Sequence, residues 1–204
     1  MSVSTRAEEI LAETGAVIVD SHVVYTSGRH GTAYVNKDAV YPHPVQVSEL
    51  CRMLADVAAA DRPEVVCGPA LGGIILSQWT AHHLGALAVY AEKLPGGELA
   101  LRRGYDRIVA GRRVLVVEDI VTTGGSVRQT VAAVRAAGGQ VTMVTALCNR
   151  GGVTAADLGV PAFSALLTLS LDSWEAASCP LCRDGVAVNT DVGKGREFLA
   201  SRPS

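Results

Sequence analysis

Two acidic residues and a hydroxyl-rich turn stand close together in the middle of the chain. Glu118 and Asp119 are followed, after two apolar residues, by the sequence T-T-G-G-S at residues 122–126. Hydroxyl groups and backbone N–H groups of glycines suit a phosphate dianion, above all where the turn opens a helix. The carboxylates beside such a turn suit the hydroxyl groups of a sugar. These residue types in this order predict a site for a phosphorylated sugar.

The elements on either side of this turn would hold it at the edge of a sheet. Residues 114–117 are continuously apolar, which predicts a strand buried on both faces of a parallel sheet. The acids then fall at its carboxyl end, where open α/β sheets place their ligands. Apolar spacing over 127–137 predicts a helix that ends at Gly138 and Gly139. The turn contains neither the lysine of a P-loop nor a G-x-G-x-x-G motif, although a plain strand-to-helix turn with solvated acids stays an alternative.

The thirteen residues 114–126, V-L-V-V-E-D-I-V-T-T-G-G-S, are similar to the phosphoribosyl pyrophosphate (PRPP) signature of type I phosphoribosyltransferases. The resemblance implies an α/β fold, a Rossmann-like parallel sheet flanked by helices, with a small N-terminal hood. It implies that Glu118 and Asp119 bind the ribose hydroxyls and that Mg²⁺ arrives mainly with PRPP. The turn would wrap the 5′-phosphate through Thr122, Thr123, Gly124, Gly125 and Ser126.

A second strand, at residues 65–67, also ends in a glycine-rich turn before a helical pattern over 74–84. By position this turn resembles the diphosphate loop of the same family, often built around a non-proline cis peptide. The backbone amides expected to hold the diphosphate belong to Ala70, Leu71, Gly72 and Gly73. Lys93, after the predicted strand at 87–90, aligns with a family lysine near the diphosphate.

Residues 94–105 depart from the orotate phosphoribosyltransferases, which usually carry a mobile K-x-H-G loop here. The L-P-G turn and charged second strand look more like the hairpin flap of purine phosphoribosyltransferases. Arg102 or Arg103 could supply the charge that pairs with a diphosphate. The expected catalytic residues are therefore Lys93, Asp119, Arg102 and Arg103.

Two other segments are expected to bind the base. Residues 26–41 are similar to the hood of orotate phosphoribosyltransferases, although Thr26 stands where many members have a lysine. Arg150 ends the predicted strand at 141–148, and its planar fork suits a base carboxylate. A solvated Lys37 and a surface Arg150 are the alternatives. The expected base-binding residues are Ser27, Gly28, Arg29, Tyr34, Lys37 and Arg150.

The chain of 204 residues is long enough for one core, and 49% of its residues are apolar and 19% charged. We expect a single domain over 1–204, with a hood (1–42), a core (43–170) and a C-terminal extension (171–204). A net charge of −2 gives no reason to expect nucleic acid or a membrane as partner. The N-terminus has no apolar signal core, so we expect a cytoplasmic protein, and the family implies a homodimer.

Outside these motifs, the pattern predicts helices over 5–16 and 44–60, short strands at 17–19 and 23–25, a strand at 160–166 and a short helix at 173–176. Of five cysteines, only Cys179 and Cys182 have metal-ligand spacing. A structural zinc takes four ligands, and no histidine or second cysteine pair lies near them in sequence. A zinc with distant or shared ligands and a pair of partly buried thiols both stay open, and no protein metal ligand is assigned.

Three functions remain open from the sequence. The chain transfers phosphoribosyl from PRPP to orotate, or it uses a purine or another base, or it binds PRPP as a regulator without turnover. The hood and Arg150 favour orotate, and residues 94–105 favour a purine. Orotate-dependent release of diphosphate from PRPP separates the three.

Overall fold

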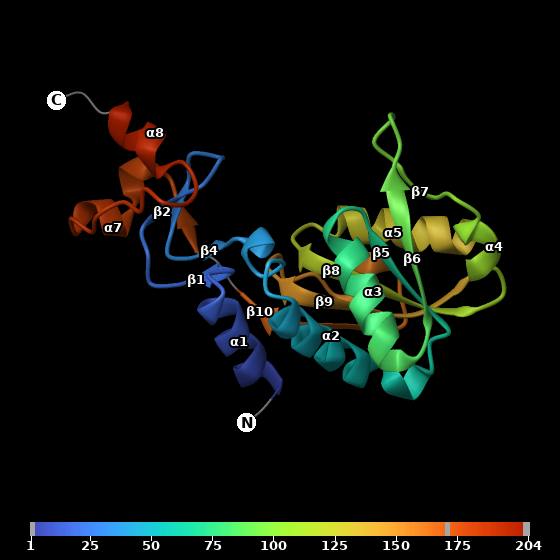
Figure 1. The fold of residues 1–204 in the computed structure, drawn as a ribbon. Helices are drawn as coiled ribbons and strands as arrows, with labels where there is room; N and C mark the ends of the chain where they lie inside the picture. The colour runs from blue at the N-terminus through green and yellow to red at the C-terminus, as the bar shows by residue number, and fades with distance from the viewer. Residues whose placement is uncertain (1–2, 170–171, 202–204) are drawn as a thin grey trace.

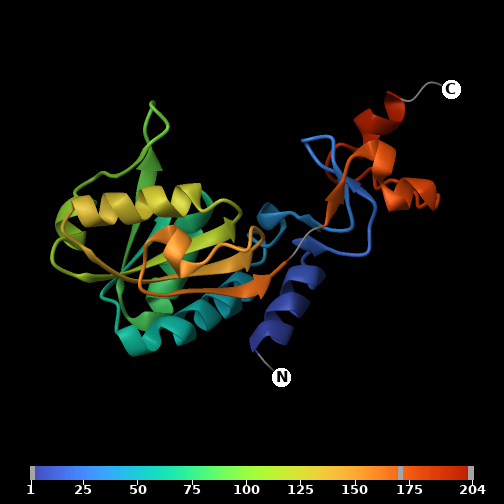
Figure 2. The same cartoon turned by 180° about the vertical axis from the view of Figure 1, so that it is seen from behind.

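The computed structural model describes residues 3–169 and 172–201. A large lobe is built around a sheet, and in a small lobe the N-terminal and C-terminal parts of the chain lie side by side (Figures 1 and 2). The boundary expected between core and extension, at residues 170 and 171, lies outside the described residues. So do residues 1–2 and 202–204 of the expected domain.

The large lobe contains a sheet of six strands within the described part of the chain. Its order is β10-β9-β8-β5-β6-β7, and every neighbouring pair is parallel except β6 and β7. The mixed α/β class and the parallel core expected from the sequence are thus confirmed. The strands are β5 (Val65–Pro69), β6 (Leu87–Lys93), β7 (Leu99–Leu101), β8 (Arg113–Val121), β9 (Gln140–Asn149) and β10 (Phe163–Thr168).

Alternate residues of β8 reach two separate hydrophobic clusters, one on each face of the sheet. Leu115 and Val117 pack with residues of α1 (Val3–Glu13), α2 (Pro44–Ala58) and α3 (Gly72–Leu84). Val114 and Val116 pack with residues of α4 (Tyr105–Val109), α5 (Gly125–Ala136) and α6 (Ala155–Leu158). Each such side chain, when fully buried, contributes about 1.5–3 kcal/mol. The unbroken apolar run of this strand is therefore explained by helices on both faces.

The small lobe is made of short elements from both ends of the chain. β2 (Val23–Val24), β3 (His30–Gly31) and β11 (Ser173–Trp174) form a sheet of order β11-β3-β2. β1 (Val17–Ile18) pairs with β4 (Tyr34–Val35) at the junction with the large lobe. The small lobe also contains α7 (Pro180–Arg183), α8 (Gly195–Ala200) and the 3₁₀ helix η3 (Ala176–Ser178), whereas the 3₁₀ helix η1 (Lys37–Ala39) lies between β4 and α2 and η2 (Ala59–Asp61) directly follows α2.

The predicted helix at 173–176 is wrong. Ser173 and Trp174 pair antiparallel with Gly31 and His30, and a 3₁₀ turn follows only at Ala176. Their conformation is decided by the exposed edge of β3, an element more than 140 positions away in the chain, and not by local spacing. Among the described residues, no helix has the length and apolar character needed to cross a bilayer.

Candidate active site

The carboxyl ends of β5, β6 and β8 meet at one edge of the sheet and surround a crevice of roughly 420 Å³. This follows from the parallel order, because strands that run the same way end at the same edge. Most of the residues expected to hold PRPP are brought together here from three separate segments. Its lining includes Ala70, Leu71, Gly72, Lys93, Glu118, Asp119, Gly125 and Ser126, together with Lys37 and Gln129.

Glu118 is 4% exposed and lies against the first turn of α5. Ser126 Oγ donates to its Oε2 at 2.6 Å, and the Asp119 N–H donates to its Oε1 at 3.0 Å. Burial, and next the charge of Asp119, raise the pKa of Glu118 to about 8. The carboxyl group therefore holds a proton near neutral pH, and the acidic pair carries about one negative charge instead of two.

Asp119 is held by a tyrosine and a lysine of the segment before α2. Tyr41 donates its hydroxyl to Asp119 Oδ2 at 3.2 Å, and Lys37 Nζ lies 3.2 Å from the same oxygen. Burial and the charge of Asp119 raise the pKa of Tyr41, so its hydroxyl keeps the proton that it donates. Burial lowers the pKa of Lys37, but its contacts with Asp38 and Asp119 outweigh that and raise it, so the ammonium stays charged.

Sequence reasoning missed Tyr41 and assigned Lys37 to the base. Tyr41 is the last residue of the expected hood segment 26–41, yet no spacing reveals a contact that spans 78 positions. Lys37 lines both the PRPP crevice and the groove that leads toward the base side. The structure thus places this lysine between the two parts of the site.

The loop after β5 passes directly over the acidic pair. The peptide bond between Ala70 and Leu71 is cis, the geometry that the family resemblance implied. A Cβ on Gly72 would overlap Asp119 Oδ2 and lie 2.7 Å from the Tyr41 hydroxyl. Gly72 is therefore the residue that lets this loop approach the carboxylate. Gly73, the last residue of the expected diphosphate loop, is buried beneath it and does not line the crevice.

The T-T-G-G-S turn leads from β8 into α5 as expected. Gly124 precedes the helix with φ 74°, a left-handed conformation that favours glycine, and a Cβ there would also meet Leu158 Cδ2 at 2.7 Å. Thr122 and Thr123 are exposed. The first turn of this twelve-residue helix faces the crevice through Gly125 and Ser126. Its free N–H groups and its dipole favour an anion at this position.

A groove connects the crevice with a second pocket of roughly 460 Å³ between the two lobes. The groove shares Lys37 and Asp119 with the crevice, and Tyr34 and Arg150 with the second pocket. Four of the residues expected on the base side meet in that pocket, namely Ser27, Arg29, Tyr34 and Arg150. Gly28 lies at the tip of the turn with φ 80° and does not line it. One continuous channel therefore runs from the acidic pair to Arg150.

The C-terminal extension also contributes to the second pocket, which the sequence did not reveal. Ser173 and Gly193 line it together with Tyr25. The Arg29 guanidinium donates to Ser173 Oγ at 3.0 Å and forms an ion pair with Glu175. No local pattern marks these residues, because they join the pocket only through pairing between the two ends of the chain.

The hairpin after β6 carries the remaining predicted residues. Lys93 ends β6, is exposed and lines the crevice, and it pairs with Leu99 of β7 in the antiparallel arrangement expected of a flap. Arg103 forms an ion pair with Glu92, and Arg102 is exposed. Neither arginine lines the crevice in this conformation, and their catalytic assignment stays a prediction.

Comparison with known proteins points in the same direction as this geometry. Residues 36–159 match the family described as "Phosphoribosyl transferase domain". The chain is 45% identical over 177 residues to an orotate phosphoribosyltransferase of Pelotomaculum thermopropionicum, covering 87% of this chain and 90% of the relative. It is 36% identical over 188 residues to the enzyme of the same name from Thermotoga maritima, covering 92% and 98%.

Solved structures give the same result. The orotate phosphoribosyltransferase of Mycobacterium tuberculosis, in complex with Fe(III) dicitrate, superposes with a TM-score of 0.66 at 29% identity. The match covers 80% of this chain and 96% of that one. The same protein in complex with PRPP superposes with a TM-score of 0.63 at 28% identity over the same shares of the two chains.

Proposed function

The chain belongs to the phosphoribosyl transferase family, and from this premise we propose that it transfers the phosphoribosyl group of PRPP to orotate. The products are orotidine 5′-monophosphate and diphosphate, a step in the making of pyrimidine nucleotides. One observation carries the proposal beyond the family. A continuous channel joins the crevice around Glu118 and Asp119 to a pocket that contains Arg150, in a chain 36–45% identical to orotate phosphoribosyltransferases.

The crevice supplies the groups that PRPP needs. Glu118 and Asp119 are placed to accept hydrogen bonds from the ribose hydroxyls, and the first turn of α5 is placed for the 5′-phosphate. Leu71, Gly72 and Lys93 line the part of the crevice where we place the diphosphate, whereas the Ala70 N–H donates to the carbonyl oxygen of Ala91. Tyr41 and Lys37 hold the Asp119 carboxylate in one orientation, so the sugar meets an acceptor that is already positioned.

The second pocket suits orotate because it combines a planar cation with aromatic and hydroxyl side chains. Arg150 can bind the carboxylate of the base through two parallel hydrogen bonds. Tyr34 and Ser27 also line this pocket, and Arg29 is fixed by Ser173 and lies in the same pocket. Gly28 stands in the turn between Ser27 and Arg29, at φ 80°.

The reaction then rests on positioning and on neutralisation of charge. A ring nitrogen of the base attacks C1 of the ribose while diphosphate leaves from the other side, and positive character develops on the sugar. Lys93 stabilises the leaving diphosphate, and Arg102 and Arg103 follow strand β7, outside the crevice. Burial and the charge of Asp119 raise the pKa of Glu118, and two neighbouring carboxyl groups of this kind would fit a hydrated Mg²⁺ bound mainly through PRPP, which would add to the neutralisation of the diphosphate. No covalent nucleophile on the protein is required.

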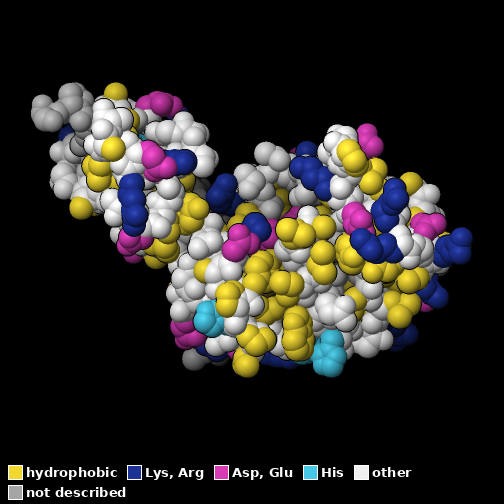
Figure 3. Space-filling view, turned by 45° about the horizontal axis from the view of Figure 1, so that its top comes forward, with side chains coloured by type: hydrophobic (Ala, Val, Ile, Leu, Met, Phe, Trp, Pro, Cys, Tyr) yellow, Lys and Arg dark blue, Asp and Glu magenta, His cyan; other side chains and the backbone are white. Residues whose placement is uncertain are grey.

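We also infer a homodimer in the cytoplasm. Hydrophobic side chains gather on the face of the large lobe seen in Figure 3, and outside the crevice Val45 of α2 is 73% exposed and Ile75 of α3 37%. Apolar surface of this kind suits contact with a second copy. All five cysteines are free thiols, which suits a reducing compartment. Light scattering after size-exclusion chromatography measures the dimer directly, and a monomer at micromolar concentration would contradict it.

The proposed activity is tested by measuring diphosphate released from PRPP with orotate, adenine or hypoxanthine as acceptor. Release with orotate alone supports the proposal, release with a purine selects the purine enzyme, and binding of PRPP without release selects a regulator. Arg150→Ala should raise KM for orotate far more than KM for PRPP, whereas Asp119→Ala should weaken PRPP binding more than tenfold. Arg52→Ala, on the exposed surface of α2, is the matched control. Equal effects of Arg150→Ala on both substrates would remove the carboxylate role.

A further inference from the structure

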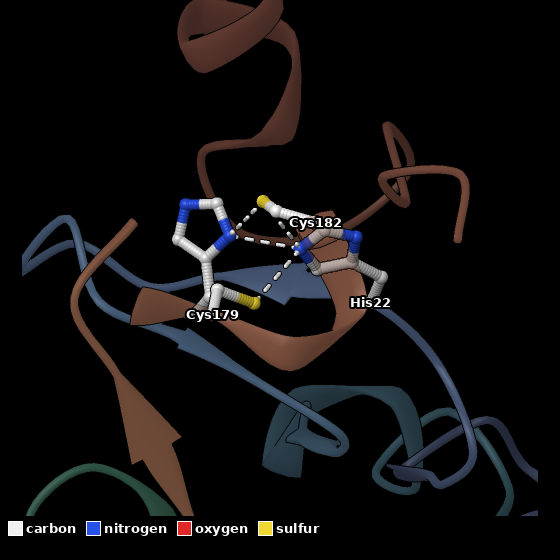
Figure 4. A group of neighbouring side chains, drawn as sticks. His22, Cys179 and Cys182 are labelled. Atoms are coloured by element: carbon white, nitrogen blue, oxygen red, sulfur yellow. Dashed lines mark hydrogen bonds between the residues drawn. The ribbon is translucent and has the colours of Figure 1, made fainter. Parts of the chain in front are cut away.

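Four side chains with metal-binding atoms converge in the small lobe, far from the PRPP crevice. They are His22 and His30 from the N-terminal part and Cys179 and Cys182 from the C-terminal part. One ligand atom from each lies within 4.8 Å of the other three. Figure 4 shows His22 directed toward the two cysteine sulfurs, which come from the segment around α7. The cysteine pair identified in the sequence thus meets two histidines more than 150 positions away.

Three of the separations between these atoms fit a tetrahedral zinc site. Zinc bonds of about 2.0 Å to nitrogen and about 2.3 Å to sulfur put neighbouring ligand atoms about 3.3–3.8 Å apart. Cys182 Sγ lies 3.4 Å from His30 Nδ1 and 3.6 Å from His22 Nε2, and Cys179 Sγ lies 3.7 Å from His22 Nε2. The two ring nitrogens are 2.8 Å apart, so they need to separate by about 0.5 Å to admit the ion.

The ring nitrogen of His22 outside the cluster, Nδ1, already has the hydrogen-bond partner that a metal-binding histidine needs. This nitrogen lies 2.7 Å from the carbonyl oxygen of Val186, which can only accept, so the proton sits on Nδ1. The lone pair of Nε2 then points into the cluster. A backbone carbonyl in this role sets the tautomer and orients the ring in many metal sites. Val186 follows a turn at Gly185, which closes directly after the cysteine pair.

The cluster is buried in a lobe that has few buried apolar side chains. His22, His30 and Cys179 are 1%, 0% and 3% exposed, and Cys182 is half-buried. Neither of the two hydrophobic clusters among the described residues includes a residue of 19–33 or 172–201. The strands here have only two residues each. Small units of this kind are commonly stabilised by a metal in place of a hydrophobic core.

We propose that His22, His30, Cys179 and Cys182 bind one structural Zn²⁺ that ties the two ends of the chain together. Two thiolates and two neutral imidazoles balance the charge of the ion, so the complex is neutral in its buried position. Binding releases one proton from each thiol, and no electron is transferred. A tetrahedral set of two sulfurs and two nitrogens is typical of zinc. Because the protein supplies all four ligands, the site is structural and not catalytic.

The ion would also set the shape of the base pocket. Arg29 directly precedes His30, and Ser173 pairs with Gly31 directly after it. Arg29 and Ser173 both line the second pocket, so the cluster of four metal-binding side chains lies behind the wall of this pocket. Loss of the metal should therefore raise KM for orotate more than KM for PRPP, a consequence that rests on the proposed function. The metal site itself is tested without any substrate.

The first experiment measures bound metal by mass spectrometry after purification without chelators and with reduced thiols. The wild-type chain should contain about one zinc per chain, and His22→Ala, Cys179→Ser and Cys182→Ser should each contain at least tenfold less. Cys51→Ala, on α2 in the large lobe, removes a thiol outside the cluster and should keep the zinc. Zinc retained by the Cys179→Ser, Cys182→Ser double variant would overturn the assignment.

A second measurement uses the unaltered chain, in case the variants fail to fold. A strong chelator should lower the melting temperature, and added Zn²⁺ should restore it. The chelated protein should also take up one Co²⁺ per chain and show the visible bands of a tetrahedral site with thiolate-to-cobalt charge transfer. A wild-type protein that takes up neither ion, or whose intact mass shows a disulfide between Cys179 and Cys182, would refute the zinc site.

Discussion

The buried carboxyl group of Glu118 should make the stability of the ligand-free protein depend on pH. In the folded chain this group is 4% exposed and lies beside Asp119, and both features favour its protonated form. Glu118→Gln keeps the shape of the protonated carboxyl group and an oxygen that can accept from Ser126. The amide cannot ionise, so the variant isolates the effect of this one proton.

The size of the effect follows from the pKa. The pKa of Glu118 is raised from an ordinary 4.5 to about 8 by burial and by the Asp119 charge. Between these values the folded chain binds more protons than the unfolded chain, so the free energy of unfolding falls as pH rises. The stabilisation is complete below pH 4.5 and is lost once pH has passed 8. At about 1.4 kcal/mol for each tenfold change in proton concentration, the loss is about 3 to 5 kcal/mol.

The assay is equilibrium unfolding in urea at pH 5 and pH 9, without PRPP or magnesium. We expect the free energy of unfolding of Glu118→Gln, minus that of wild type, to rise by about 3 to 5 kcal/mol between the two pH values. Groups that do not interact with Glu118 are common to both proteins and cancel in this difference. Glu98→Gln, an exposed carboxylate on the hairpin, is the matched control and should show no such rise. A difference for Glu118→Gln that stays within about 0.5 kcal/mol across the range would refute the reasoning.

Three further predictions follow from single contacts. Gly72→Ala should weaken PRPP binding at least tenfold in calorimetry, because the new Cβ displaces the Asp119 carboxylate; unchanged affinity would show that the loop and the carboxylate can move apart. Tyr41→Phe should weaken PRPP binding about three- to tenfold, the equivalent of one hydrogen bond of about 0.5–1.5 kcal/mol, and a wild-type dissociation constant would count against its orienting role. Thr154→Ala should lower the free energy of unfolding by about 1 kcal/mol, because it removes the reciprocal cap with Asp157 at the start of α6. An unfolding midpoint in urea equal to that of wild type would contradict this prediction.

The sequence by itself determined the parallel sheet and the crevice that we propose for PRPP. The strand at 114–117, the acidic pair and the T-T-G-G-S turn are contiguous, so their local conformation already places carboxylates, hydroxyls and a helix N-terminus together. Unbroken apolar runs are possible only in strands covered on both faces, which made the parallel core predictable as well. The loop proposed for the diphosphate was predicted for the same reason, because its glycines directly follow a buried strand.

Only the tertiary structure decided which distant residues complete these local units. Tyr41 reaches Asp119 across 78 positions, and Ser173 enters the base pocket because β11 pairs with β3 and does not form the expected helix. The proposed zinc ligands show most clearly which contacts the sequence alone does not reveal. Cys179 and Cys182 have recognisable spacing, but their partners His22 and His30 stand at the other end of the chain. Such contacts depend on strand pairing between the two ends of the chain, and neither composition nor local periodicity encodes that pairing.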